Sequence, residues 1–244
     1  MTNNDSFDAM FSGIIGREYQ MLKLICPFAA EMSRLVGAAV GDFCNRTQDT
    51  VGVLELGGGT GITTLSILSA NERLKVLSVD NEPTMQNQAK QSLEAWAEQG
   101  RLTFCSDDAL TALKGLAAES FDVVASAYTL HNFENDYRDQ VHQEIFRVLK
   151  PGGQLINGDR YALDDIDAHT RNTQHEVAAY FKALTAINRL DLLEHWIIHL
   201  FSDESENHIM REAVAVRQLA QAGFEPISIS LRKDVNALLT AVKP

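Results

Sequence analysis

The sequence has few cysteines, few prolines and a shortage of basic residues. Its three cysteines are odd in number and form no CxxC pair, so a disulfide framework is not expected. We interpret Cys26, Cys44 and Cys105 as reduced core thiols of a cytoplasmic protein. Lys and Arg total 21 against 33 Asp and Glu, and the resulting net charge of −12 is a poor match for phosphate backbones. Direct nucleic-acid binding is therefore not expected.

Long apolar runs are missing as well. The longest, such as VGAAV and HWIIHLF, fall far short of the ~20 residues that cross a bilayer, so no membrane span is expected. The first ten residues contain acids and no basic region, which argues against a secretory leader. Five prolines and 15 glycines are too few for a disordered chain, and 45% hydrophobic residues are enough for a sizeable core.

Short apolar segments alternate with longer helical patterns along the middle of the chain. The apolar segments are nearly continuous, as in strands that are buried on both faces of a parallel sheet. The alternation predicts an α/β fold with a doubly wound, mostly parallel sheet and right-handed crossovers. The predicted strands are 51–56, 75–80, 102–107, 121–128 and 154–159.

Two segments lie outside this alternation within what we interpret as a single domain, 1–244. Residues 7–44 are predicted to form helices that precede the core at 51–160, and residues 163–212 form a long, mostly helical insertion. The segment 213–244 then supplies the closing helix end and two closing strands. An insertion of this length is typical of a segment that covers or shapes a site.

The loop in VLELGGGTGITTL, residues 53–65, directly follows the first predicted strand. Ligands of open parallel sheets bind beyond the carboxyl ends of the strands, so a nucleotide is expected here. A dinucleotide fingerprint fails, because its last position would be Ile62 rather than glycine or alanine. Glu55 ends the strand beside the loop, and a carboxylate favours a cationic ligand over an anionic one.

Five motifs in order resemble the S-adenosylmethionine-dependent methyltransferase superfamily of Rossmann-like fold. They are ELGGGTG, Asp80 at the end of the second strand, SDDAL after the third, SAYTLHNF after the fourth and LKPGG before the fifth. The resemblance covers about 51–160. It implies a seven-stranded sheet, S-adenosylmethionine as cofactor and S-adenosylhomocysteine as product.

The resemblance also implies a set of cofactor contacts. The glycines let the backbone approach the methionine and ribose parts, Glu55 lies near the sulfonium, and Asp80 accepts both ribose hydroxyls. Asp108 and Ala109 meet the adenine, with Asp107 as the alternative if the register differs by one residue. The implied cofactor-binding residues are Glu55, Gly57, Gly58, Gly59, Gly61, Asp80, Asn81, Asp107, Asp108, Ala109, Ala127, Tyr128 and Thr129.

His131, in YTLHNF, follows the strand that carries the methionine contacts. Histidine titrates near neutrality, so His131 is either a base that takes a proton from the acceptor or a residue that packs under the cofactor. By position, Tyr19, Arg160 and Tyr161 are candidates to line the acceptor pocket. Apolar helical surfaces make a homodimer plausible.

Other polar patterns give weaker signals. His195 and His199 are spaced i, i+4, so one helix face offers two metal ligands. No third ligand has a matched spacing, and we expect no metal site. Asp164, Asp165 and Asp167 are interpreted as a solvated turn that caps a helix.

Three functions follow. The first is a methyltransferase that moves a methyl group by in-line displacement to an oxygen or nitrogen of a small molecule, in a pocket closed by 7–44 and 163–212. The second is a reaction on the cofactor itself, because the layout also resembles carboxy-S-adenosylmethionine synthase, which supplies a tRNA wobble-uridine modification. In that family an arginine of the insertion holds the added carboxylate, and Arg189 is the nearest match. The third is a cofactor-binding subunit without catalysis.

Overall fold

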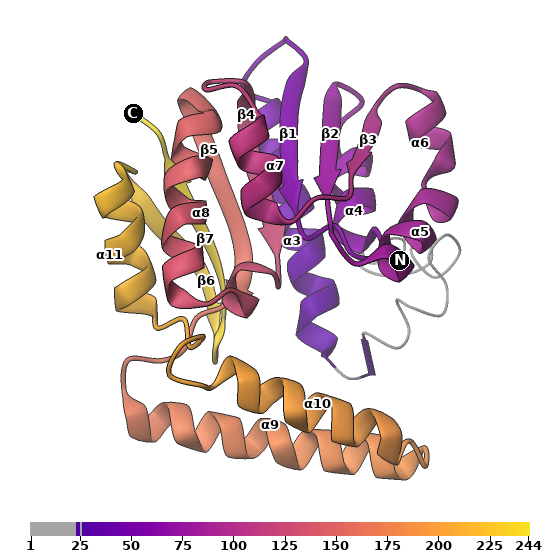
Figure 1. Ribbon diagram of the computed structural model, residues 1–244, viewed down its shortest axis with the longest axis vertical. Helices are drawn as coiled ribbons and strands as arrows, with labels where there is room; N and C mark the ends of the chain where they lie inside the picture. The colour runs from indigo at the N-terminus through magenta and orange to yellow at the C-terminus, as the bar shows by residue number, and fades with distance from the viewer. Residues whose placement is uncertain (1–22, 25) are drawn as a thin grey trace.

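A seven-stranded sheet forms the centre of the molecule, as the computed structural model shows for the residues it describes, 23, 24 and 26–244 (Figure 1). The strand order is β3-β2-β1-β4-β5-β7-β6, with β1 to β5 parallel and β7 antiparallel to both β5 and β6. The predicted fold class is confirmed. The strands are β1 (Val51–Leu56), β2 (Leu74–Val79), β3 (Leu102–Cys105), β4 (Phe121–Ala127), β5 (Leu149–Arg160), β6 (Ile227–Lys233) and β7 (Asn236–Val242).

Helices cover both faces of this sheet (Figure 1). Strand side chains alternate between the faces, so Val51 and Val53 enter the core under α3 and α4, while Leu54 and Leu56 enter the core under α7, α8 and α11. The helices are α3 (Pro27–Cys44), α4 (Ile62–Ala70), α5 (Pro83–Ser92), α6 (Glu94–Glu98), α7 (Ala109–Gly115), α8 (Asn135–Val148), α9 (Ile166–Ala186), α10 (Leu190–Asp203), α11 (Glu212–Ala222) and the 3-10 turn η1 (Leu130–Asn132).

The strand order reverses between β1 and β4, which places a switch point at the carboxyl ends of these two strands. The loops after β1, β2, β3 and β4 all emerge at this edge, and they carry the motifs that the sequence analysis singled out. The sheet therefore gathers residues from four separate stretches of the chain along one edge.

The insertion forms a pair of helices, α9 and α10, which lies beyond the carboxyl ends of the central strands (Figure 1). The two helices share a small apolar core of their own, formed by Tyr180, Leu184, Leu193 and Leu200. The predicted covering segment is thus a helical hairpin placed over the site edge. Within the described part of the chain, no helix combines the length and apolar character needed to cross a membrane.

Candidate functional site

The glycine loop after β1 forms the floor of a groove of about 720 Å³ that extends to α10. Gly57 and Gly59 have φ angles of +74° and +52°, a region that side chains rarely adopt. A Cβ at Gly57 would lie 1.9 Å from Thr129 Oγ1, whereas a Cβ at Gly59 would meet nothing within 4 Å. Gly59 therefore faces open space that a ligand can fill, as expected, and Gly57 is also needed for packing against β4.

Two other loop glycines are required by the protein rather than by a ligand. A Cβ at Gly58 would lie 2.0 Å from Ser78 Oγ, although Gly58 also lines the groove. Gly61 caps α4 with a φ of +92°, and a Cβ there would come within 2.8 Å of Leu93 Cδ1. Gly61 borders neither the groove nor the cavity beside it, which corrects the expected cofactor contact.

Asp80 holds the middle of the site. Its Oδ2 accepts a hydrogen bond from Gly59 N at 2.7 Å, and its Oδ1 accepts one from Glu82 N at 2.8 Å. A carboxylate offers about four lone-pair sites, so each oxygen retains one for a ligand. Asp80 lines both the groove and an adjoining cavity of about 410 Å³, as does Gly57. This position between two compartments suits the expected contact with a ribose.

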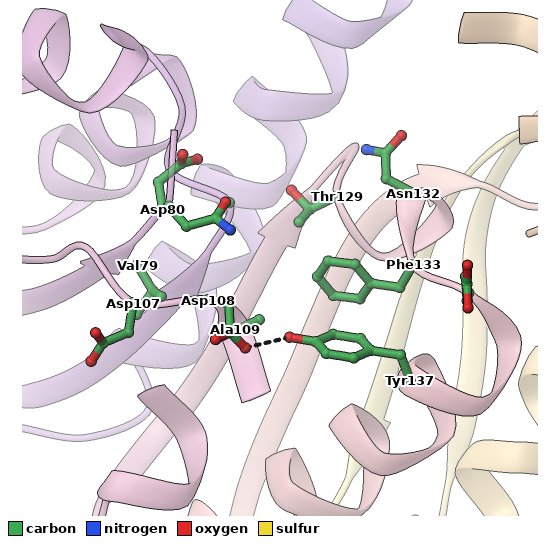
Figure 2. Close-up of a pocket in the computed structure, with 12 residues that line it drawn as sticks. Val79, Asp80, Asp107, Asp108, Ala109, Thr129, Asn132, Phe133 and Tyr137 are labelled. Carbon is green, nitrogen blue, oxygen red and sulfur yellow. Dashed lines mark hydrogen bonds between the residues drawn. The ribbon is translucent and has the colours of Figure 1, made fainter. Parts of the chain in front are cut away.

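The adjoining cavity lies between the loops after β2 and β3 and the start of α8 (Figure 2). Four residues that the resemblance implies as cofactor contacts line it, namely Asn81, Asp107, Asp108 and Ala109. It is also lined by the rings of Phe133 and Tyr137, which pack edge to face 5.0 Å apart. These two aromatic residues were missed, although aromatic rings separated by four residues in a helical pattern were a usable signal.

Asp108 has a structural task in this cavity. Its carboxylate caps α7 by accepting from Leu110 N and Thr111 N, and it also accepts from the Thr111 hydroxyl and from Tyr137 Oη at 2.7 Å. These hydrogen bonds, that of the Thr111 hydroxyl foremost, lower the pKa of Asp108 to about 2. The exposed Asp107 is therefore the carboxylate with more freedom to meet a ligand, which was the alternative register.

Glu55 does not reach the groove, which corrects the expected contact with the sulfonium. Its side chain is 0% exposed beneath the glycine loop, where Oε2 accepts from Thr64 Oγ1 at 2.6 Å. Burial raises the pKa of Glu55 to about 7 despite hydrogen bonds from Thr64 and Ser78. The cause is strand geometry: alternate side chains of β1 face opposite sides, and position 55 faces α4 rather than the strand end.

The turn after β4 is strained. Tyr128 has a φ of +51°, which is unusual for a bulky side chain, and its N–H donates to Gly158 O at 2.9 Å. Its hydroxyl donates to Asn236 of β7. Ala127, Tyr128 and Thr129, which are expected to contact the methionine part, all line the groove.

A second, deeper cavity of about 230 Å³ opens beside the groove, and we call it the inner chamber. The two compartments share six lining residues, which are Ala29, Met85, Tyr128, Asn132, Trp196 and His199. The chamber is bordered by side chains from α3, the turn after β4, the end of β5 and both insertion helices. Its lining is Cys26, Ala29, Met85, Tyr128, His131, Asn132, Arg160, Tyr180, Trp196, His199, Leu200 and Asp203.

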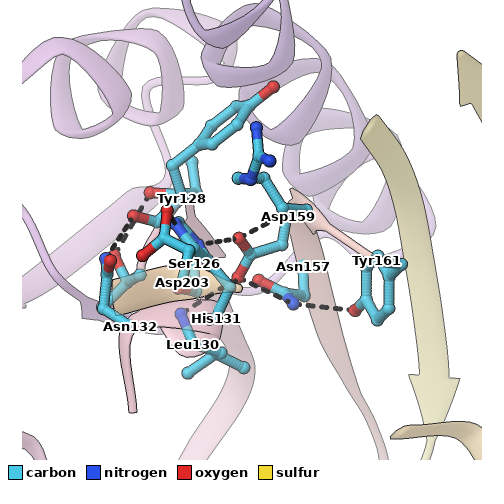
Figure 3. A network of polar contacts seen from close by, with 12 residues as sticks. Ser126, Tyr128, Leu130, His131, Asn132, Asn157, Asp159, Tyr161 and Asp203 are labelled. Atoms are coloured by element: carbon cyan, nitrogen blue, oxygen red, sulfur yellow. Dashed lines mark hydrogen bonds and ion pairs between the residues drawn. The ribbon is translucent and has the colours of Figure 1, made fainter. Parts of the chain in front are cut away.

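His131 enters the chamber from η1 with its ring fixed by a carboxylate (Figure 3). His131 Nδ1 lies 2.6 Å from Asp159 Oδ1, and Asp159 also accepts from Leu130 N and Arg160 N. Burial pushes the pKa of Asp159 up, but the charge of His131 and these hydrogen bonds hold it below its usual value. An ionised partner at Nδ1 holds a proton on that nitrogen, so the other ring nitrogen, Nε2, is left to accept a proton or bind a ligand.

Asp203, at the end of α10, lies between two imidazoles. Its Oδ2 is 3.7 Å from His131 Nε2 and 3.7 Å from His199 Nε2. His195 stacks on the far side of His199 with 6.5 Å between ring centroids. Burial lowers the pKa of His199, against the opposing effect of Asp203. The sequence pairs His195 with His199, whereas the structure brings His199 and Asp203, which are spaced i, i+4 on α10, close to His131 of η1.

Arg160 lines the chamber but is already neutralised. Its guanidinium forms a bidentate pair with Glu176 at 2.9 and 3.0 Å and lies 3.5 Å from Glu204. Glu204 also pairs with His169 Nε2 at 2.5 Å. These contacts hold α9 and α10 to the end of β5.

Two candidate pocket residues lie elsewhere, and a third lies outside the described residues. Tyr161 is buried in the opposite core, where its hydroxyl accepts from Asn157 Nδ2 at 2.8 Å. Arg189, the residue before α10, has a half-exposed side chain that pairs with Asp191 at 2.7 Å. Neither borders the groove or the chamber. Tyr19 belongs to 1–22, which the structure does not describe.

Residues 53–153, which contain the glycine loop, Asp80 and the turn after β4, match a family described as a methyltransferase domain. This match, with the relatives described below, confirms the resemblance to the superfamily of S-adenosylmethionine-dependent methyltransferases. The match agrees with the expected cofactor, S-adenosylmethionine, and with S-adenosylhomocysteine as its product. The match runs from β1 to the start of β5, and it leaves β6, β7 and the helices α3, α9, α10 and α11 outside it.

Individual relatives differ in chemistry. The chain is 26% identical over 179 residues to the carboxy-S-adenosyl-L-methionine synthase of Cronobacter sakazakii, covering 71% of this chain and 67% of that protein. Among solved structures it resembles an O-methyltransferase family protein from Burkholderia thailandensis, with a TM-score of 0.61 and 19% identity. It also resembles an O-methyltransferase family 2 protein from Planctomyces limnophilus in complex with apigenin, with a TM-score of 0.59 and 17% identity. These two alignments cover 99% and 81% of this chain but only 60% and 52% of the other chains, so the likeness shows the fold.

Proposed function

We propose that the protein transfers a methyl group to an oxygen or nitrogen of a small molecule that binds in the inner chamber. The observation that carries this proposal is the continuity of the site: the groove opens into a chamber where His131, held by the buried Asp159, faces the space. Bound S-adenosylmethionine supplies an electrophilic methyl group on a sulfonium. The residues of the chain bind, orient and desolvate the two reactants.

The groove and its adjoining cavity suit an elongated nucleoside. The rings of Phe133 and Tyr137 offer flat apolar surface for a base, and Asp80 offers free lone pairs at the junction. The bare backbone at Gly57 and Gly59 leaves room for the amino-acid part to approach Thr129. This order places the sulfonium end beside the entrance to the inner chamber.

In the proposed reaction the acceptor attacks the methyl carbon in line with the carbon–sulfur bond, whose electron pair stays on sulfur. The acceptor proton passes to His131 Nε2, and Asp159 stabilises the imidazolium that results. Positioned general bases of this kind contribute about 10²- to 10⁴-fold.

The chamber favours a flat apolar acceptor with one polar group. Tyr128, Tyr180 and Trp196 contribute aromatic surface, and the polar groups cluster at the end formed by His131, His199 and Asp203. The flavone in the Planctomyces limnophilus relative is consistent with an acceptor of this chemistry.

The test is transfer of tritiated methyl from the cofactor into fractions of a metabolite extract, followed by identification of the labelled product. We expect a labelled O- or N-methyl compound with an aromatic ring. A protein that binds the cofactor yet labels no fraction would contradict the proposal. The variant His175→Ala, an exposed position on α9, is the matched control for histidine replacements.

A second candidate is a reaction that carboxylates the cofactor, which the similarity to carboxy-S-adenosyl-L-methionine synthases favours. The charges oppose it. An added carboxylate needs an uncompensated cation, but among the described residues Arg160 is the one arginine or lysine of the chamber, and it already pairs with Glu176 and Glu204. Asp203 adds a further negative charge. Mass spectrometry of the ligand that copurifies would decide, since a carboxylated cofactor would select this second reaction.

We also propose a homodimer. Large apolar side chains are exposed on the insertion, among them Phe181, Ile198 and Phe201, at 50%, 61% and 74% exposure. A two-fold contact through α9 and α10 would cover them. Light scattering during size-exclusion chromatography checks this proposal, and a monomer at all concentrations would contradict it.

A further inference from the structure

Three potential metal ligands converge at the polar end of the inner chamber. One donor atom each from His131, His199 and Asp203 lies within 4.8 Å of the other two, and both imidazole Nε2 atoms are 3.7 Å from Asp203 Oδ2. Donors bound to one zinc ion at 2.0–2.1 Å are about 3.3 Å apart in a tetrahedral site. Small side-chain movements therefore suffice to bring all three donors onto one ion.

The separations are also informative as they stand. A gap of 3.7 Å is too long for a hydrogen bond, so neither imidazole is hydrogen-bonded to Asp203 although both face it. By contrast, His131 Nδ1 makes a close contact of 2.6 Å with Asp159 on its other side. The three donors thus surround a space that an ion would draw together.

The outer contacts match those of metal-bound histidines. Such a histidine usually donates its second ring N–H to a carboxylate or carbonyl, which fixes the ring and strengthens the ligand. Asp159 is the carboxylate partner of His131 Nδ1, and it also accepts hydrogen bonds from Leu130 N and Arg160 N. A fourth coordination position would point into the chamber, where the acceptor is proposed to bind.

The charges favour a cation here. Asp159 is 0% exposed and the side chain of Asp203 is 9% exposed, and carboxylates removed from water need a positive partner. Arg160 cannot serve Asp203 fully, because it is bound to Glu176 and Glu204. A divalent ion would compensate both carboxylates at once.

We propose that His131, His199 and Asp203 bind a divalent transition-metal ion, with Zn²⁺ as the best match. Two imidazoles and one carboxylate with an open fourth position are a donor set that Zn²⁺ takes in catalytic sites. The site deepens the proposed function and rests on it only for its role: an acceptor hydroxyl bound to the ion releases its proton to solvent more readily. His131 Nε2 is then a ligand, and it acts as a base only in the metal-free protein.

The experiment is a titration of the metal-free full-length protein with Zn²⁺ and Co²⁺. We expect saturable binding of one ion per chain by calorimetry and elemental analysis, and visible absorption typical of four- or five-coordinate Co²⁺. His199→Ala and Asp203→Asn are each expected to weaken binding at least tenfold. Asp159→Asn, which weakens the support of His131 without removing any of the three ligands, is expected to weaken binding by about 10- to 100-fold.

The matched control is His195→Ala, which removes the neighbouring imidazole one turn away on α10 and leaves the three ligands in place. We expect its metal affinity to equal that of the unaltered protein, and circular dichroism verifies the fold of each variant. Equal losses in His195→Ala and His199→Ala, or no one-to-one binding by the unaltered protein, would overturn the inference.

The metal site and the proposed function fail separately. Methyl transfer by a protein that binds no ion would refute the metal site and leave the methyltransferase proposal standing. One bound ion at these ligands, without methyl transfer to any acceptor, would refute the methyltransferase proposal and leave the metal site standing.

Discussion

The groove and the inner chamber are built from the same edge of the sheet by different means. The groove joins the bare backbone of the glycine loop after β1 to Asp80 after β2, and the turn after β4 and α10 contribute to its lining. The chamber presents ionisable side chains from β5, η1 and α10, which are paired with each other. Backbone recognition suits a cofactor that a whole superfamily shares, whereas paired side chains set the chemistry of one acceptor. The predictions below test this division.

The largest effect is expected from His131→Ala. In the metal-free protein, methyl transfer should fall by about 10²- to 10⁴-fold, because the variant removes the proposed general base. Cofactor affinity should stay within about twofold, because His131 does not line the groove. Kinetics with the identified acceptor and calorimetry with the cofactor measure the two effects. Equal losses of methyl transfer and of cofactor affinity would contradict separate roles for the groove and the inner chamber.

Glu55→Gln tests the titratable group beneath the groove. The pKa of Glu55 is raised to about 7 in the fold, so the native state holds the proton more tightly than the unfolded chain does. Stability is therefore lost as the pH rises from about 4.5 to about 7, and the full loss for a shift of this size is about 3 kcal/mol. The variant should be more stable than the unaltered protein at pH 8 and similar to it at pH 4. Urea unfolding at both pH values measures this, and an unchanged pH dependence would contradict the buried position.

Asp80→Asn tests the recognition of the cofactor. A charge-assisted hydrogen bond is worth about 1.5–3 kcal/mol, so cofactor affinity should fall by about 10- to 100-fold. The control is Asp122→Asn near the start of β4, at the end of the sheet away from Asp80. There the carboxylate accepts from Gly52 N and pairs with Lys150. Calorimetry should show normal cofactor affinity for the control. Undiminished binding by Asp80→Asn would remove Asp80 from the site.

Gly57→Ala and Gly59→Ala form a matched pair within one loop. Both place alanine at a positive φ, but only the Cβ at position 57 overlaps Thr129. Overpacking typically costs about 1–3 kcal/mol, so Gly57→Ala should be less stable than Gly59→Ala by about that amount. Gly59→Ala should instead mainly lower cofactor affinity, because its Cβ enters the groove. Thermal unfolding with and without the cofactor separates the effect on stability from the effect on cofactor binding. Equal stability of the two variants would show that the Thr129 side chain moves to accommodate the Cβ at position 57.

The fold and most of the groove were predictable because their signals are local. The strand 51–56, the loop glycines and Asp80 each follow from short-range patterns, and the structure places the predicted strands within a few residues of β1 to β5. Local reasoning failed for Glu55 and Tyr161, whose positions in the chain were predicted correctly but whose side chains face the cores. A shift of one position along a strand reverses the face, and adjacency in sequence does not reveal which face a site needs.

The sequence alone determined the sheet, the superfamily resemblance and the edge where the cofactor binds, because periodicity and glycine chemistry act over a few residues. The tertiary structure alone decided the partners of His131. Asp159 comes from β5 and Asp203 and His199 from α10, and these distant segments meet only because α9 and α10 fold back over the carboxyl ends of the strands. Contacts between residues this far apart depend on packing of the whole domain, which pairwise spacing in a single sequence does not record.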